Sequence, residues 1–312
     1  MTGKIPLLVL NMQTPEHLAQ IEQVYDVTYA IDKASRTAAM ATQGARYRAV
    51  LTNGGLGLSQ AEIDAMPQLE LICAMGAGYE NVAIDAARAR GIVVANGAGT
   101  NDDCVADPAF GLLIAAVRGI VKLDRQCRDG VWREAIAFPP NVSGRKLGIV
   151  GLGMIGEKIA RRAAGFDIAV GYHNRRPKEG AAHRYFDSLL ALAQWADFLV
   201  VATPGGAGTK HLIGREVLDA LGPRGVLVNI ARGSVVDTEA LAAALTEGRL
   251  GGAGLDVYES EPLPPQPLIG LDNVVLTPHV AGWSPEAVQA SVDRFLANAE
   301  GHFSGKGPVS PV

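Results

Sequence analysis

The feature that most constrains the fold is a glycine motif between an apolar run and a helical pattern. The run Leu147–Val150 is followed by Gly151, Gly153 and Gly156 in the spacing Gly-x-Gly-x-x-Gly, and Glu157–Ala164 continues with helical spacing. A strand that turns into a helix through such glycines brings backbone N–H groups and the helix N-terminus to a phosphate. The motif therefore predicts a nucleotide-binding unit, with a glycine-rich turn that holds no ligand as the alternative.

Short apolar runs alternate with helical patterns along the whole chain. This alternation predicts an α/β fold with two Rossmann-like domains. We expect a doubly wound, parallel-sheet nucleotide-binding domain at 101–284, inserted into a smaller flavodoxin-like substrate domain at 1–100 and 285–312. One long helix is expected over about Asp107–Asp129, and another over Pro285–Phe303 that packs on the first domain. The expected strands are Leu7–Leu10, Ala49–Thr52, Leu71–Ala74, Ile92–Ala95, Leu147–Val150, Ile168–Tyr172, Phe198–Ala202, Val226–Ile230, Gly254–Val257 and Val274–Thr277.

Composition and charge exclude several classes of function. Lys and Arg total 28 against 32 for Asp and Glu, a net charge of −4, so no basic excess indicates a nucleic-acid or membrane-surface partner. The chain has an odd number of cysteines, three, and no CxxC pair: they are Cys73, Cys104 and Cys127. This argues against a disulfide framework and a thiolate metal site. Without a signal-like N-terminus or an apolar run of about 18 residues, we expect a cytoplasmic protein with no membrane span and no metal.

The end of the second expected strand of the nucleotide-binding domain indicates which cofactor binds. NAD-binding units carry an Asp or Glu about 20 residues after the glycines, where it accepts from the ribose 2′-OH. Here the sequence reads His173-Asn174-Arg175-Arg176, without an acid. Guanidinium groups pair with phosphate oxygens, so this loop favours the 2′-phosphate of NADP, and NADPH over NADH.

One histidine lies where open α/β sheets bind their ligands. His279 follows the expected strand Val274–Thr277, at the carboxyl edge of the sheet. Arg232 and Glu261 follow two other strands of the same domain. Taken singly, each has a structural interpretation: Arg232 as an ion-pair partner, Glu261 as an acid at a helix entry beside Pro262, and His279 as a structural histidine. Together they indicate a catalytic set. A glycine-loop enzyme that uses S-adenosylmethionine would leave these later residues unexplained.

At these residues the sequence resembles the D-isomer-specific 2-hydroxyacid dehydrogenase family, and the resemblance covers essentially the whole chain. Besides the glycine motif, the matching segments are Asn229–Asp237, Gly254–Pro262 and Thr277–Ala281, with a carboxylate loop at Met75–Asn81 and a Gly-x-Trp element at Gly130–Trp132. The resemblance implies that His279 donates a proton, that Glu261 supports it, and that Arg232 holds the substrate.

The resemblance also implies the contacts with cofactor and substrate. The expected substrate contacts are Asn53, Met75, Gly76, Ala77, Gly78, Arg232 and His279, and the N–H groups of Ala77 and Gly78 would bind a carboxylate. The expected cofactor contacts are Gly151, Gly153, Met154, Ile155, Gly156, Asn174, Arg175, Arg176, Thr203, Pro204, Ile230, Ala231, Asp256 and Gly282. A homodimer is implied, with Asp107–Asp129 and Trp132 in the contact region.

These observations lead to one main hypothesis and two alternatives. The main one is an NADPH-dependent reductase of the small 2-oxo acids glyoxylate and hydroxypyruvate. Within the family, the sequence most resembles the glyoxylate/hydroxypyruvate reductases. One alternative is a reductase of bulkier 2-oxo acids, such as 2-ketogluconate or an arylpyruvate, with Trp283 beside the pocket. The other is a non-catalytic nucleotide-sensing protein on the same scaffold, against which the complete set of Arg232, Glu261 and His279 argues.

Overall fold

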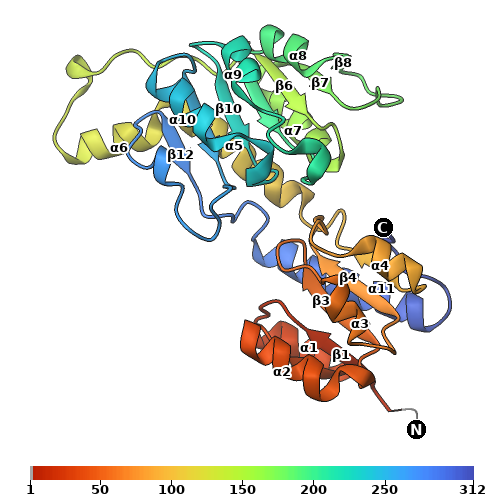
Figure 1. The fold of residues 1–312 in the computed structure, drawn as a ribbon. Coiled ribbons are helices and arrows are strands. Elements are labelled where there is room, and N and C mark those ends of the chain that lie inside the picture. The colour runs from red at the N-terminus through yellow and green to blue at the C-terminus, as the bar shows by residue number, and fades with distance from the viewer. Residues whose placement is uncertain (1–2) are drawn as a thin grey trace. The chain divides into compact units, whose positions relative to one another are not determined.

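The computed structural model describes residues 3–312 and divides the chain into two compact units (Figure 1). Unit 1 ends at Asn101 and resumes from Trp283 to Val312, and unit 2 runs from Asp102 to Gly282. Each unit is built on one parallel sheet with helices packed on it. The α/β class with two Rossmann-like domains, predicted from the sequence, is confirmed.

Unit 1 has a five-stranded sheet in the order β2-β1-β3-β4-β5, which is the flavodoxin-like order. All its strand pairs are parallel. Four strands coincide closely with the expected apolar runs, because strands covered on both faces consist of nearly continuous apolar residues. The strands are β1 (Ile5–Val9), β2 (Tyr25–Tyr29), β3 (Ala49–Asn53), β4 (Leu71–Met75) and β5 (Val93–Asn96).

Four helices of unit 1 begin at a side chain that caps them. Thr14, Asp32, Ser59 and Ser284 accept hydrogen bonds from the first N–H groups of α1, α2, α3 and α11. The C-terminal helix has the bounds predicted from the sequence and packs on β4, as expected. The helices are α1 (Pro15–Val24), α2 (Lys33–Gln43), α3 (Gln60–Asp64), α4 (Ile84–Ala89) and α11 (Pro285–Phe303), with a 3₁₀ turn η1 (Gly44–Arg46).

Unit 2 has a seven-stranded sheet in the order β12-β11-β10-β9-β6-β7-β8, and all its pairs are parallel. The order reverses between β6 and β9, which is the switch point of a doubly wound nucleotide-binding sheet. Six strands correspond to expected runs. The strands are β6 (Lys146–Val150), β7 (Ala169–His173), β8 (Arg184–Tyr185), β9 (Phe198–Val201), β10 (Val226–Asn229), β11 (Gly252–Leu255) and β12 (Val274–Leu276).

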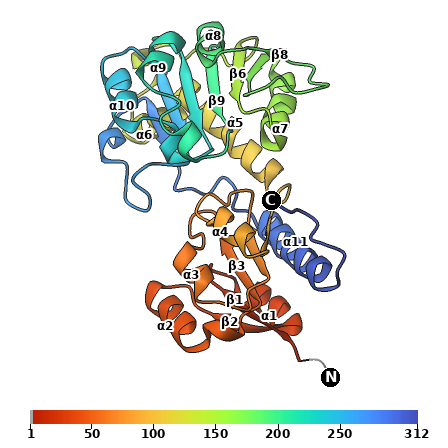
Figure 2. The same cartoon turned by 45° about the vertical axis from the view of Figure 1, so that its right-hand side comes forward.

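Helices cover both faces of the unit 2 sheet (Figure 2). Residues of α5 and α7 share one core cluster with the strands, and residues of α8, α9 and α10 share the other. The helices are α5 (Asp102–Arg118), α6 (Ile120–Arg128), α7 (Met154–Ala163), α8 (Leu189–Trp195), α9 (Arg215–Leu221) and α10 (Thr238–Thr246). The 3₁₀ turns are η2 (Arg133–Ala135), η3 (Ala164–Phe166), η4 (Ala207–Thr209), η5 (Gly233–Val235) and η6 (Gln266–Leu268).

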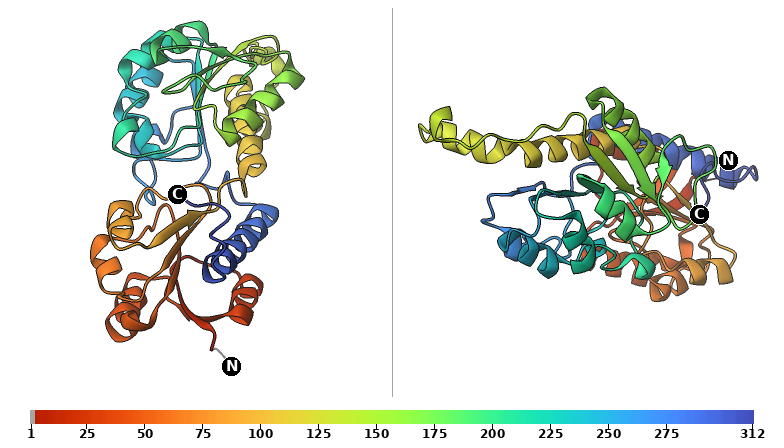
Figure 3. Two further views of the ribbon diagram at one scale, coloured as in Figure 1. Left: turned by 90° about the vertical axis from the view of Figure 1, so that its right-hand side faces the viewer. Right: turned by 90° about the horizontal axis from the view of Figure 1, so that it is seen from above.

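The single long helix expected over Asp107–Asp129 is wrong. Gly119 adopts φ +64°, a left-handed conformation that glycine takes without strain, and it separates α5 from α6 with a bend of 59°. Helix α6 has no buried residue and, in Figure 3, it extends away from the rest of unit 2. Among residues 3–312 no single helix is long and apolar enough to cross a membrane, and only the bent pair α5 and α6 together reaches that length and composition.

Candidate active site

Three neighbouring strands of unit 2 bring Arg232, Glu261 and His279 to the same edge of the sheet. In the register of the sheet, Asn229 of β10 lies beside Leu255 of β11, and Leu255 lies beside Leu276 of β12. The segments that carry the three side chains therefore leave the sheet at its carboxyl edge. Arg232 is close enough for its charge to act on both the imidazole and the carboxylate.

His279 and Glu261 form a hydrogen-bonded pair. His279 Nδ1 lies 2.7 Å from Glu261 Oε2, and Glu261 Oε1 accepts the Tyr258 N–H at 2.7 Å. The His279 side chain is 47% exposed and that of Glu261 is 33% exposed. Because Nδ1 faces the carboxylate, Nε2 is the ring nitrogen left for a ligand, which is the arrangement of a proton donor that is held by a carboxylate.

The pair shifts the pKa of each partner in opposite directions. The hydrogen bond that His279 donates to Glu261 raises the pKa of His279 above its ordinary value, although partial burial and the Arg232 charge act the other way. Partial burial acts to raise the pKa of Glu261, but the hydrogen bonds from His279 and the Tyr258 N–H outweigh it, and the net pKa is lowered. The pairing therefore widens the pH range in which a charged imidazole faces a charged carboxylate.

Asp256 organises the loop that carries His279. Its side chain is 1% exposed, and its Oδ1 accepts from Thr277 Oγ1 at 2.6 Å and from the Val280 N–H at 3.0 Å. Its Oδ2 accepts from the Ala281 N–H at 2.9 Å. His279 itself has φ +54° and donates its N–H to the Asp256 carbonyl at 2.8 Å. These bonds hold a left-handed histidine that would otherwise be strained.

Tyr258 is a residue of the site that sequence reasoning missed. Its hydroxyl lies 2.9 Å from the Leu255 carbonyl and 2.6 Å from the Thr277 carbonyl, so it links the ends of β11 and β12. Burial, together with the nearby charge of Asp256, raises the pKa of Tyr258 to about 12, which keeps the hydroxyl protonated. Its position inside the Gly254–Pro262 segment was the only signal for it in the sequence.

Arg232 lies in a turn that is held by hydrogen bonds with Asn229 and by the close packing of Gly233. The buried Asn229 donates from Nδ2 to the Arg232 carbonyl at 3.0 Å and accepts the Ala231 N–H at 3.0 Å. Gly233 packs so tightly that a Cβ there would lie 1.9 Å from the carbonyl carbon of Tyr258. Only glycine lets the turn after β10 approach the loop after β11 this closely.

The glycine loop has the geometry that a pyrophosphate requires. Gly151 has φ +100°, and a Cβ there would meet the Ala202 carbonyl and the Thr203 N–H, both at 2.8 Å. A Cβ at Gly156 would lie 2.4 Å from the Gly151 carbonyl oxygen, so this glycine allows α7 to pack closely on the loop. A Cβ at Gly153, which precedes α7, would meet nothing within 4 Å. The open space at a helix N-terminus fits the diphosphate of a nicotinamide dinucleotide.

The loop after β7 presents two cations next to the glycines. Asn174 Oδ1 accepts the Leu152 N–H at 2.7 Å and so ties this loop to the glycine motif. Arg175 and Arg176 are exposed, and neither forms an ion pair within residues 3–312. No carboxylate occupies the end of β7. Guanidinium groups in this place can pair with phosphate oxygens of a cofactor.

The other expected contacts lie at strand ends in both units. In unit 2, Met154 and Ile155 begin α7, and the exposed or half-buried Thr203, Pro204 and Gly282 lie in loops. Ile230 and Ala231 are buried after β10. In unit 1, Asn53 ends β3 and Met75 ends β4, where the two residues pair in register, and Gly76, Ala77 and Gly78 follow. The structure thus places the triad and the cofactor loop in unit 2, and the expected substrate loops in unit 1.

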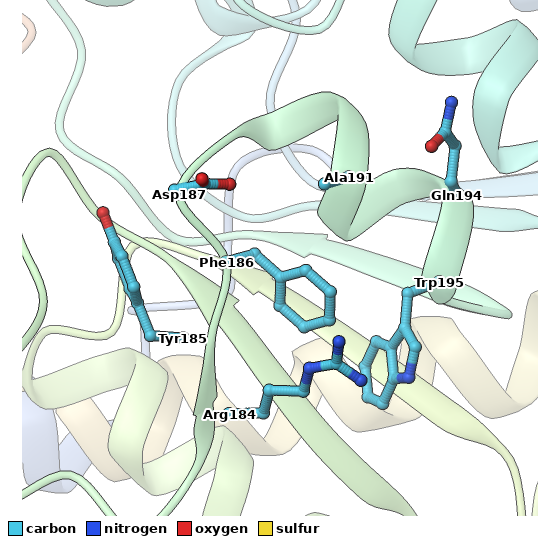
Figure 4. A pocket seen from close by; sticks show the side chains of 7 residues that line it. All are labelled: Arg184, Tyr185, Phe186, Asp187, Ala191, Gln194 and Trp195. Carbon is cyan, nitrogen blue, oxygen red and sulfur yellow. The ribbon is translucent and has the colours of Figure 1, made fainter.

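A surface pocket lies elsewhere on unit 2 (Figure 4). Arg184, at the start of β8, stacks its guanidinium 4.5 Å from the centre of the Phe186 ring, and Phe186 packs against Trp195 at the end of α8. β8 runs parallel to β7, and Arg184 lies beside Gly171 in the middle of β7. None of the expected site residues lines this pocket.

Comparisons with known proteins agree with this geometry. A family model described as "D-isomer specific 2-hydroxyacid dehydrogenase, NAD binding domain" matches residues 110–281. A hydroxyphenylpyruvate reductase of Plectranthus scutellarioides is 43% identical over 274 residues, which is 88% of this chain and 88% of that protein. Glyoxylate/hydroxypyruvate reductase A HPR2 of Arabidopsis thaliana is 42% identical over 266 residues, 85% of each chain.

A solved structure extends the similarity to the whole chain. The NADPH-dependent glyoxylate/hydroxypyruvate reductase of Sinorhizobium meliloti, in complex with NADP and malonate, is similar with a TM-score of 0.92 and 36% sequence identity. The match covers 99% of this chain and 97% of that one.

Proposed function

Because this chain belongs to the D-isomer-specific 2-hydroxyacid dehydrogenase family, and is thus an oxidoreductase with a nicotinamide cofactor, we propose that it reduces small 2-oxo acids with NADPH. Glyoxylate and hydroxypyruvate are the proposed substrates, and the products are 2-hydroxy acids, of D configuration where C2 is chiral. The observation that carries this proposal is the His279–Glu261 pair beside Arg232, on the sheet edge that also carries the glycine loop.

The three side chains have separate tasks in this reaction. The bound cofactor supplies hydride to C2 of the 2-oxo acid. Negative charge then grows on the carbonyl oxygen, and His279 donates the proton from Nε2. Glu261 keeps the imidazole charged and fixes its orientation through the 2.7 Å bond to Nδ1. A positioned acid of this kind contributes about 10²–10⁴-fold to the rate. Arg232 binds the carboxylate and polarises the carbonyl.

The preference for NADPH rests on the loop after β7. Arg175 and Arg176 are exposed cations, and no acid is present to repel a 2′-phosphate. We propose that both guanidinium groups bind this phosphate, and that Gly151, Gly153 and Gly156 accommodate the diphosphate. A similar protein from Sinorhizobium meliloti is described as NADPH-dependent, which supports the same assignment.

A reductase of bulkier 2-oxo acids is the second candidate. The similar protein from Plectranthus scutellarioides is named for an arylpyruvate substrate, which keeps this class open. The proposed contacts with the side chain of the substrate are Asn53, Met75 and the loop that follows Met75, all in unit 1. A non-catalytic nucleotide sensor is disfavoured, because a sensor needs no charged His279–Glu261 pair.

We also propose that the chain forms a homodimer through the segment that follows α5. Ile120 and Val121 at the start of α6 are 48% and 44% exposed, and Trp132 and Phe138 further along are exposed to a greater degree. Exposed apolar side chains that gather on one projecting segment are typical of a surface that a partner covers. A second copy of the chain is the proposed partner.

One kinetic experiment tests the proposed function. Glyoxylate, hydroxypyruvate, 2-ketogluconate and phenylpyruvate are assayed with NADPH and with NADH, for the natural chain and for His279→Gln. We expect the highest kcat/KM for the two small acids with NADPH, and a loss of about 10²–10⁴-fold in the variant. Full turnover by His279→Gln would refute the proton donor, and higher efficiency with NADH would refute the role of the arginines.

A further inference from the structure

A second histidine–carboxylate pair lies beside the triad in unit 2. His211 Nε2 is 2.6 Å from Glu259 Oε1, a separation close to the 2.7 Å of the His279–Glu261 pair. Glu259 Oε2 also accepts from the N–H and the hydroxyl of Thr238, at 3.1 and 2.7 Å. These bonds outweigh partial burial and lower the pKa of Glu259, so its carboxylate is charged.

On one side, this pair is attached to the turn that carries Arg232. The His211 N–H donates to the Ser234 carbonyl at 2.8 Å, and the Ile213 N–H donates to the Val235 carbonyl at 3.0 Å. The segment 211–213 therefore runs along η5, which begins directly after Arg232. His211 has φ +51°, a conformation that non-glycine residues adopt only where the surroundings hold them.

On the other side, the pair is attached to the loop that carries Glu261. The main chain at Tyr258 and Glu259 is the surface against which Gly233 packs without room for a Cβ. The Tyr258 N–H, adjacent to Glu259 in the chain, is the group that orients Glu261 Oε1 at 2.7 Å. A displacement of Glu259 would therefore move the donor that fixes Glu261, and with it the partner of His279.

We propose that His211 and Glu259 are positioning residues for the reaction, a proposal that rests on the reductase function given above. Their pair links the segments that follow β9, β10 and β11, and so holds Arg232 and Glu261 in register with His279. Neither residue needs to touch substrate or cofactor for this role. The consequence is that loss of the pair alters the chemistry at His279 as well as the stability of unit 2.

Four variants test the proposal. His211→Ala and Glu259→Gln remove or weaken the pair, while His211→Gln keeps an amide donor near the position of Nε2. Glu247→Gln is the matched control, because Glu247 forms an equally short pair with Arg249 at 2.6 Å and lies at the end of α10, outside the segments that carry the triad. Each protein is measured for thermal stability, for kcat and KM with glyoxylate over a range of pH, and for the NMR titration of the His279 ring without substrate. The ring signal is assigned by its absence in His279→Gln.

The expected result separates positioning from stability. In His211→Ala and Glu259→Gln the His279 ring titrates at lower pH, and kcat at about pH 8 falls roughly tenfold, the scale of a small misplacement. His211→Gln recovers most of the His279 titration pH and most of kcat, and Glu247→Gln changes neither quantity. The charged groups acting on this ring are Glu261, Arg232 and Asp256, and all four variants retain them.

Two results would overturn the proposal. One is a His279 titration and a pH profile in His211→Ala that match the natural chain while stability alone falls; this variant decides the question if Glu259→Gln does not fold. The other is a change in the His279 titration and in kcat that is as large in Glu247→Gln as in His211→Ala. If the natural chain reduces no 2-oxo acid, the proposed function fails, whereas the NMR titrations still decide whether His211 and Glu259 position the pair.

Discussion

Replacing Glu261 by glutamine should change the pH dependence of the reaction more than its maximum rate. Proton donation requires a charged His279, and Glu261 raises the pKa of this imidazole through their 2.7 Å hydrogen bond. In Glu261→Gln the amide oxygen is expected to keep the Tyr258 N–H, which turns the NH₂ group toward Nδ1. An NH₂ group in this place favours the neutral imidazole with its proton on Nε2. The pKa of His279 therefore falls.

The size of the effect follows from the exposure of the pair. Hydrogen bonds to charged groups contribute about 1.5–3 kcal/mol in proteins. Because His279 is 47% and Glu261 33% exposed, solvent screening puts this bond near the lower limit. A loss of about 1.4 kcal/mol is a factor of about ten. We expect kcat/KM for glyoxylate reduction to fall about tenfold at pH 8 and to stay near the natural value at acidic pH, where both imidazoles are protonated.

Both directions of the reaction test the sign. A raised pKa keeps His279 charged up to a higher pH, so the alkaline limb of reduction in Glu261→Gln moves to lower pH. Oxidation of a 2-hydroxy acid needs the neutral imidazole as a base, so its acidic limb moves to lower pH as well. The assay is kcat/KM against pH in both directions, with Glu247→Gln as the control. Limbs that stay in place, or move to higher pH, would refute the assigned coupling.

Three further predictions concern the cofactor loop and the surface. Arg175→Ala and Arg176→Ala should each lower kcat/KM with NADPH about tenfold and leave NADH unchanged; an equal loss with NADH would contradict phosphate binding. Gly153→Ala should raise KM for NADPH without lowering Tm, whereas Gly156→Ala should cost about 1–3 kcal/mol of stability, because its Cβ would lie 2.4 Å from the Gly151 carbonyl oxygen. Denaturation curves and cofactor titrations check both. Phe138→Asp should convert a dimer to a monomer in sedimentation, and a monomeric natural chain would contradict this proposal.

The sequence predicted the strands that form apolar runs, including the edge strands β5 and β12, and missed the edge strands β2 and β8. β9, with the sequence Phe-Leu-Val-Val, is fully buried, and such a run needs no alternation to be recognised. β2 (Tyr25–Tyr29) is an edge strand that mixes polar and apolar residues, and its burial is partial, so no run marks it. The break at Gly119 depends on a positive φ, and a glycine within a helical pattern does not reveal whether it adopts one.

The sequence predicted which residues form the candidate site and at which strand ends they lie, but it did not predict the hydrogen bonds between them. A histidine after the last parallel strand is visible in the sequence, because strand ends of one sheet share an edge. That Glu261 meets this histidine depends on the turn from Tyr258 to Glu261 and on the N–H that orients the carboxylate. Likewise, the sequence suggested Asp256 as a cofactor contact, whereas the structure shows its two oxygens holding the Thr277–Ala281 segment.

The organisation of unit 2 explains how one sheet edge holds a proton donor, its carboxylate partner and a guanidinium group in fixed positions. Parallel strands in fixed register precede all three residues, Arg232, Glu261 and His279. The backbone pairing of the sheet therefore sets their approximate positions along its edge, independently of side-chain contacts. The fine position of these segments is then set by two groups outside the triad: the buried Asp256 holds the His279 loop, and the half-buried Tyr258 links β11 to β12. Every one of these supports lies within unit 2, and so do Glu261, Arg232 and Asp256, whose charges act on the His279 ring. Changes in the loops of unit 1 should therefore act on substrate choice and KM, and changes among these supports should act on the pH profile.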